Sequence, residues 1–122
     1  MCLTAIHPEP KTADKDIVCY KLLLQTSDGN FTSIVRNYPW SIHEPVESKL
    51  GPRSLRFDEV EEGLHAYMTL EAAEKSTFCF DRIAKAVVPK GSRYYLGTND
   101  EIAADHMELT KVHRRLYKNH GI

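Results

Sequence analysis

The chain has 122 residues and a formal net charge of −1 at pH 7, a size that fits one domain, 1–122. Hydrophobic residues make up 42% and charged residues 27%, which excludes wholesale disorder, and no apolar run approaches the roughly 18 residues that a membrane helix needs. The first ten residues lack the basic and apolar regions of a secretory signal. We therefore expect a cytoplasmic protein that does not act at a membrane.

The cysteines and histidines predict neither disulfides nor a metal site. Cys2, Cys19 and Cys79 are an odd number at wide spacings, which is typical of reduced thiols in an intracellular protein. The six histidines include no pair at the i, i+4 spacing of a helical zinc site. Glycine-rich phosphate loops and a G-x-S-x-G nucleophile motif are also absent from the sequence. We accordingly assign no catalytic residue, no metal ligand and no cofactor.

The first part of the chain predicts an irregular lead-in followed by a hairpin. Residues 1–15 contain Pro8 and Pro10, which oppose regular structure. Residues 17–25 are β-branched, aromatic and apolar, which is typical of a strand. The Asp28-Gly29 pair is a strong hairpin signal, so 31–35 is expected to return beside the first strand.

The middle of the chain is interrupted by prolines before its pattern becomes regular again. Residues 36–62 predict a long loop region, and long loops are often binding loops. After Gly63 the side chains of 64–68 alternate between apolar and polar, which predicts a strand. Thr69 is a suitable N-cap, and helical spacing of apolar residues follows over 70–81.

The last third of the chain predicts a run of strands and a basic tail at 113–122. The strands are expected at 83–88, 93–96, 102–104 and 106–112. A hairpin, a loop region, one helix and then several strands are typical of an α+β fold. We expect a small, curled or barrel-like, mainly antiparallel sheet with one packed helix at about 70–81.

Two groups of residues are candidates for a ligand site. His65 and Tyr67 project from one face of their strand, where they could orient a polar ligand or act as acid and base, or simply pack against the loops. Tyr20 and Lys21 point to opposite faces, so one of them shares a face with His65.

The second group combines aromatic rings with cations near a Pro-Lys-Gly turn. Aromatic rings stack on nucleotide bases and arginine pairs with phosphate, although the same aromatic residues also suit the core of a small β domain. Together the two groups predict eight ligand-binding residues: Lys21, Trp40, His65, Tyr67, Lys90, Arg93, Tyr94 and Tyr95.

Several sequence blocks resemble short proteins of anaerobic gut bacteria and their phages. The blocks are the Met1-Cys2-Leu3 start, Asp16 to Lys21, Gly63 to Tyr67 and Val87 to Gly97, of which the last is the most specific. The resemblance implies no established activity, and its phage context implies an accessory role such as interference with host defence. We therefore expect a non-enzymatic protein that sequesters a small phosphorylated ligand of nucleotide type. The rival expectation is a protein–protein inhibitor of a host enzyme that uses 36–62.

A weaker resemblance is to ADP-ribosyltransferase-like domains. These have an early strand with an aromatic and a basic residue, which Cys19-Tyr20-Lys21 resembles, and a glycine-led strand that runs into a helix, which Gly63 to Ala73 resembles. The resemblance implies a late glutamate, for which Glu101 and Glu108 are the candidates. An enzyme of this class is our third hypothesis.

The charge pattern and the last strand predict self-association. A strand at 106–112 near the end of the sheet would leave an edge that invites pairing, and the basic tail offers the opposite charge to the acidic run Asp58 to Glu62. We expect a homodimer or a higher even oligomer; the alternative is a monomer whose tail folds over its own acidic run. Nucleic acid is not expected as a partner, because non-specific binding requires several phosphate contacts and the net charge is −1.

Overall fold

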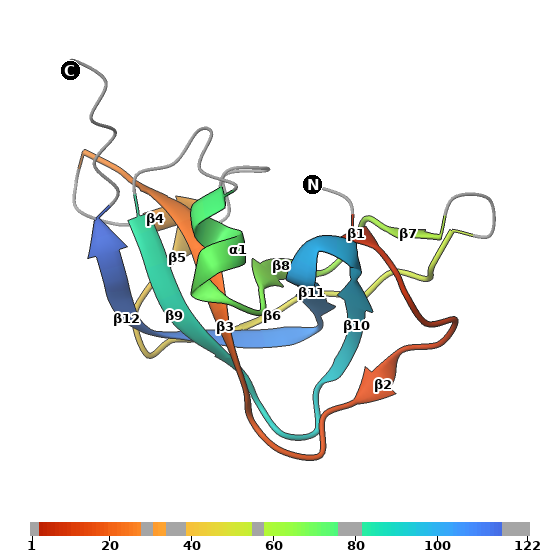
Figure 1. Ribbon diagram of the computed structural model, residues 1–122. Coiled ribbons are helices and arrows are strands. Elements are labelled where there is room, and N and C mark those ends of the chain that lie inside the picture. The colour runs from red at the N-terminus through yellow and green to blue at the C-terminus, as the bar shows by residue number, and fades with distance from the viewer. Residues whose placement is uncertain (1–2, 28–30, 34–38, 55–57, 76–81, 116–122) are drawn as a thin grey trace.

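The structure, a computed structural model, describes residues 3–27, 31–33, 39–54, 58–75 and 82–115 (Figure 1). Its elements in chain order are β1 (Leu3–Thr4), β2 (Lys11–Thr12), β3 (Ile17–Gln25), β4 (Phe31–Ser33), β5 (Pro39–Trp40), β6 (Pro45–Glu47), β7 (Glu59–Val60), β8 (Leu64–Tyr67), α1 (Leu70–Lys75), β9 (Arg82–Val88), β10 (Arg93–Gly97), a 3-10 turn (Thr98–Asp100), β11 (Glu101–Ala104) and β12 (His106–Arg115).

Most strands belong to one sheet with the order β2-β10-β11-β8-β3-β9-β12-β6, whose neighbouring strands are antiparallel. The strands β4 and β5 extend it beside the end of β3, and β1 pairs separately with β7. The prediction of a mainly antiparallel sheet with one helix is confirmed. Barrel-like closure is wrong, because the sheet runs openly from β2 to β6, and the many short strands make the fold more β-rich than a typical α+β layout.

The sheet consists of two halves, β2-β10-β11-β8 and β3-β9-β12-β6, with little backbone pairing between them. In the described residues, β8 and β3 share a single pair of partners, Tyr67 opposite Tyr20. The chain itself crosses between the halves at 13–16 and at 89–92, and most tightly at Asp105, which alone separates β11 in one half from β12 in the other. The chain therefore turns from one half of the sheet into the other at Asp105.

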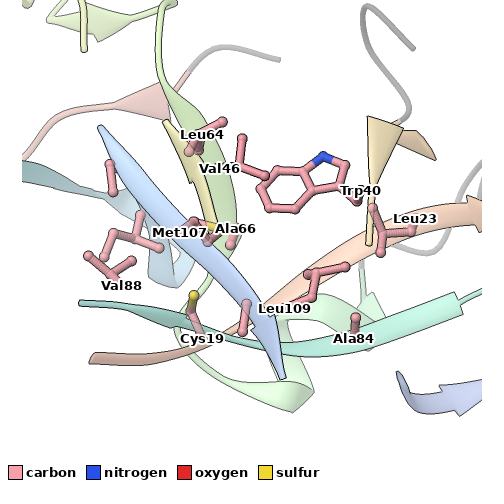
Figure 2. Close-up of a cluster of buried hydrophobic side chains, with 13 residues drawn as sticks. Cys19, Leu23, Trp40, Val46, Leu64, Ala66, Ala84, Val88, Met107 and Leu109 are labelled. Atoms are coloured by element: carbon pink, nitrogen blue, oxygen red, sulfur yellow. The ribbon is translucent and has the colours of Figure 1, made fainter. Parts of the chain in front are cut away.

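The main core lies on the face of the sheet where both halves contribute apolar side chains (Figure 2). Alternation along β3 places Cys19 and Leu23 on this face, and the indole of Trp40 reaches from β5 toward Val46 and Leu64. The strand β9 contributes small side chains such as Ala84, which leave room for larger apolar neighbours. The other core members are Ala66, Ala86, Val88, Ile102, Ala104, Met107 and Leu109.

The helix α1 covers the opposite face, where Ala73 packs with Leu22, Tyr67 and Ile83. The predicted N-cap is confirmed, since the Thr69 hydroxyl accepts a hydrogen bond from the backbone N–H of Ala72 at 3.0 Å. The second half of the predicted helix, 76–81, lies outside the described residues. No helix in the described part of the chain is long and apolar enough to cross a membrane.

Two expectations about irregular segments need correction. Residues 1–15 contain two short strands, because Leu3 pairs with Val60 and Thr12 pairs with Arg93. The long loop region at 36–62 also contributes β5, β6 and β7. Strands of two or three residues are too short to show alternation in a sequence, so only their partners reveal them.

Candidate functional site

The predicted residues Lys21, Trp40 and His65 come together inside the protein. Lys21 lies in the centre of β3, with 8% of its surface exposed. Its ammonium group donates a hydrogen bond of 2.6 Å to the backbone carbonyl of His65 and lies 5.2 Å from the centroid of the Trp40 ring. The contact with His65 involves its backbone and not its imidazole, so this cluster holds strands together at the narrow link between β3 and β8.

Burial changes the acid–base behaviour of two side chains in β3. It lowers the pKa of Lys21 to about 8, against a small opposing effect of Cys19. It also raises the pKa of the Cys19 thiol to about 12, although the positive charge of Lys21 lowers it slightly. Cys19 therefore stays protonated at neutral pH and is unsuited to nucleophilic chemistry.

Asp105, at the turn between the two halves of the sheet, connects three segments of the chain. One of its carboxylate oxygens accepts hydrogen bonds from the backbone N–H of Arg93 at 3.0 Å and from Nδ1–H of His106 at 2.7 Å. Its backbone N–H donates to the carbonyl of Arg93 at 3.1 Å, and its carbonyl accepts from the N–H of Ser48 at 2.9 Å. The start of β10, the end of β6 and the start of β12 are thereby fixed next to one another.

A pocket of about 720 Å³ lies beside Asp105, and we call it the corner pocket. Its apolar and aromatic lining consists of Pro10, Leu50, Pro52 and Tyr95, and its charged lining consists of Glu9, Glu47, Lys49, Arg93, Asp105 and His106. A volume of this size suits a small organic molecule and exceeds what an inorganic ion alone needs.

The cations of the corner pocket differ in how they are paired. Among the described residues, the charged ends of Arg93 and Lys49 have neither a hydrogen bond nor an ion pair. His106 is held on both sides, by Asp105 at Nδ1 and by Glu47, whose carboxylate lies 3.4 Å from Nε2. The hydrogen bond with Asp105 is the main reason that the pKa of His106 is raised, and the negative charges of Asp105 and Glu47 act in the same direction.

An aromatic stack supports one wall of the corner pocket. Tyr95 is 3% exposed, and the ring of His7 stacks on it with a centroid distance of 5.5 Å and an interplanar angle of 15°. The Nε2 atom of His7 accepts from the backbone N–H of Leu96 at 2.9 Å, so its proton lies on Nδ1, which donates to the carbonyl of Glu9 at 2.7 Å. This arrangement requires a neutral His7 and fixes Glu9 at the pocket wall.

Of the eight predicted ligand residues, Arg93 and Tyr95 line the corner pocket. Lys90 lies exposed in the turn before β10, where its backbone N–H donates to Asp16 at 2.9 Å, and it does not line the pocket. Tyr94 packs, half-buried, against the main core, because it is adjacent to Tyr95 in a strand and faces the other way. Lys21, Trp40, His65 and Tyr67 lie elsewhere, so the structure does not unite the predicted set in one site.

Sequence reasoning missed most of the charged lining of the corner pocket. The Asp105-His106 pair interrupts two apolar strand segments, and a polar pair at that position was the available signal. Glu47 and Lys49 carried no local signal, because they stand in the proline-interrupted region.

A second group of polar side chains lies in one row across the sheet. Tyr20 in β3 is opposite Tyr67 in β8, and Tyr67 is opposite Glu101, the first residue of β11. Residues directly opposite each other project from the same face, so these three side chains share the face that α1 partly covers. Burial raises the pKa of Glu101, against an opposing hydrogen bond from Asn99. The alternative glutamate, Glu108, lies in β12 opposite Val87 and Pro45, away from this row.

Comparisons with family models, with curated proteins and with solved structures gave no match. Within the described part of the chain, no three His, Cys, Asp or Glu side chains converge as a metal site would require. The function has to be argued from the geometry of the two groups described above.

Proposed function

We propose that the protein binds a small phosphorylated ligand of nucleotide type in the corner pocket without transforming it. The observation that supports this most directly is that Arg93 and Lys49 line one pocket and have no ionic partner among the described residues. Unpaired cations at a concave surface favour an anion, and an arginine guanidinium matches the oxygens of a phosphate group.

The apolar part of the corner pocket provides for the rest of such a ligand. Leu50, Pro10 and Pro52 line it together with Tyr95. A nucleotide has both a charged phosphate and a flat apolar base, and ligand sites commonly pair an apolar wall with a few polar groups. The resemblance to phage proteins favours sequestration of a host signal in the host cytoplasm as the purpose of binding.

Calorimetry with ADP-ribose, 3′,5′-cyclic AMP and a cyclic dinucleotide tests this proposal. We expect at least one to bind, and we expect Arg93→Gln and Lys49→Gln each to weaken binding roughly 10-fold or more, because each removes a charge-assisted hydrogen bond. Lys90→Gln is the matched control. It removes a cation three residues before β10 begins but outside the pocket, so the affinity of this variant should be unchanged. Absence of binding to all three nucleotides, together with co-purification of a host protein, would favour the inhibitor hypothesis instead.

The Tyr20–Tyr67–Glu101 row favours a second candidate function, an ADP-ribosyltransferase-like enzyme. The resemblance implies a glutamate near the aromatic early strand and the glycine-led strand. Of the two candidates, Glu101 is directly opposite Tyr67 on the glycine-led strand and one strand away from Tyr20 on the early strand. A carboxylate in that position could stabilise positive charge on a ribose as its bond to nicotinamide breaks.

Incubation with NAD separates this candidate from simple binding. The enzyme hypothesis expects nicotinamide release that Glu101→Gln reduces by roughly 100-fold or more and that Glu108→Gln leaves unchanged. If the wild-type protein releases no nicotinamide, or if both variants behave alike, the row has no such role.

A further inference from the structure

The imidazole of His106 is oriented by one carboxylate and only loosely held by another. The bond from Nδ1–H to Asp105 is 2.7 Å, and Asp105 is itself fixed by the backbone of Arg93. The distance from Nε2 to Glu47 is 3.4 Å, longer than the 2.7–3.2 Å that is usual for a hydrogen bond. Asp105 therefore sets the orientation of the imidazole ring. The Nε2 atom points toward Glu47, which lines the corner pocket.

Glu47 is the weaker and more exposed of the two carboxylate partners. Its side chain is 78% exposed, whereas that of Asp105 is 22% exposed. It belongs to the edge strand β6, and among the described residues its carboxylate has no hydrogen bond or ion pair besides the one with His106. An incoming phosphate could replace Glu47 at Nε2 without disturbing Asp105, because the two carboxylates contact different nitrogens.

We propose that His106 is the third cationic contact of the ligand, and that a phosphate group displaces Glu47 from it and binds together with a proton. This inference rests on the proposed function, to which it adds His106 as a ligand contact and the uptake of a proton on binding. In the free protein Nε2 faces Glu47 as counter-ion; in the complex it donates to a phosphate oxygen. The neutral ring cannot donate there, since its only proton is on Nδ1.

The charges around His106 determine how its protonation responds to the ligand. The charged residues that line the corner pocket together with it are Asp105 at the turn, Glu47 on β6, Glu9 before β2, Lys49 after β6 and Arg93 on β10. The carboxylates hold the pKa of the free imidazole above its usual value. A phosphate contacts Nε2 and also neutralises Arg93 and Lys49, so the complex should bind the proton more tightly than the free protein does.

The sign of the pH dependence follows from this difference. At low pH the imidazole is already protonated, so ligand affinity should be at its plateau. As pH rises above the pKa of the free imidazole, binding has to take up a proton and affinity should fall. We expect ADP-ribose to bind roughly 10-fold more weakly at about pH 8.5 than at about pH 6, the size of effect that one charge-assisted hydrogen bond supports. ADP-ribose is suitable because its phosphates are diesters of fixed charge, unlike a monoester with a second pKa of about 6.

Calorimetry of the full chain in two buffers of different ionisation enthalpy measures the affinity and the number of protons taken up. Wild-type protein should take up roughly half a proton at most in the pH range where its affinity falls, as a 10-fold change in affinity requires, while His106→Gln should bind ADP-ribose with an affinity that is low and independent of pH. Glu47→Gln should bind more tightly, by roughly 3-fold, because the competing carboxylate is gone. Glu44→Gln removes another exposed carboxylate from the same segment, outside the pocket lining, so it should match the wild type.

The outcomes separate this inference from the proposed function. Binding that depends on Arg93 and Lys49 but takes up no proton, or that is equally pH-dependent in His106→Gln, would overturn the role of His106 and leave the corner pocket as the ligand site. Absence of binding at both pH values would overturn both. A weaker affinity in Glu47→Gln would show that Glu47 assists the ligand, and would overturn its displacement.

Discussion

Lys21 is a charged side chain at the centre of the sheet, in the place where β8 diverges from β3. Its ammonium group reaches the carbonyl of His65, which would otherwise face a gap between the two strands. The Trp40 ring adds a favourable cation–π contact on the core side. Burial of an ion is costly, so the stability of the protein should depend on whether Lys21 carries its proton.

The free energy of unfolding should rise with pH in the weakly alkaline range. The folded-state pKa of Lys21 is lowered from 10.5 to about 8, so the folded protein loses this proton before the unfolded chain does. Stability is then gained as pH rises through 8, and the gain is complete above 10.5. Above pH 9 the Cys19 thiol has the opposite effect on stability. Its pKa is raised in the folded protein, so the thiol loses its proton first in the unfolded chain. Urea unfolding should show a net rise of about 1 kcal/mol between about pH 7.5 and pH 9.

Two variants test the assignment of this rise to Lys21. Lys21→Met keeps a long side chain without a titrating group, so the rise should disappear. Lys11→Met removes an exposed lysine from the edge strand β2 and should keep it. The assignment is wrong if the rise persists in Lys21→Met.

The candidate site residues could be predicted only where residues close together in the sequence indicated them. Arg93 and Tyr95 stand two residues apart in one strand and so share a face, whereas the prediction also included Tyr94, which faces the other way. Asp105, His106 and Glu47 meet because the chain turns between β11 and β12 and because β6 pairs with β12. Neither event has a local signature, so this part of the site could not be read from sequence patterns.

At the level of elements, long periodic segments were predictable and short ones were not. Predictions of strands at 17–25, 64–68 and 83–88 are confirmed within a residue or so, because each shows clear β-branched or alternating patterns. The short strand β6 has Pro45 as its first residue, which argues against a strand in isolation. It forms because it lies at the sheet edge, where a missing N–H is tolerated.

The edge strand β6 also changes the basis of the predicted dimer. It pairs with β12 at His106, Met107 and Glu108, and the N–H of His43 donates to the carbonyl of Leu109 at 2.7 Å. The first part of β12 is thus not an open edge, contrary to our expectation for 106–112. Within the described residues, the part of β12 whose outer edge could still pair with a second chain begins at about Lys111.

At the level of the whole molecule, a homodimer stays a prediction that rests on the later part of β12 and on charge. The basic residues at 113–122 and the acidic run Asp58 to Glu62 offer two complementary pairings across a two-fold axis. Light scattering at low micromolar concentration should give the mass of a dimer that dissociates in high salt, since screening weakens exposed ion pairs. Deletion of 113–122 should yield a monomer; a monomeric mass in the full chain would remove the prediction.

The position of β3 in the middle of the sheet has a consequence for how the chain folds. Its long partner is β9, where Ile17 pairs with Val88 and Leu23 with Arg82, and its other neighbour across the sheet is β8. Only the short strand β4 is close to it in sequence. A nascent chain therefore carries its most apolar strand without its main partner until β9 has been synthesised. Closing such a long loop costs entropy before any core contact repays it, so folding should be limited by this non-local pairing and not by the local hairpin.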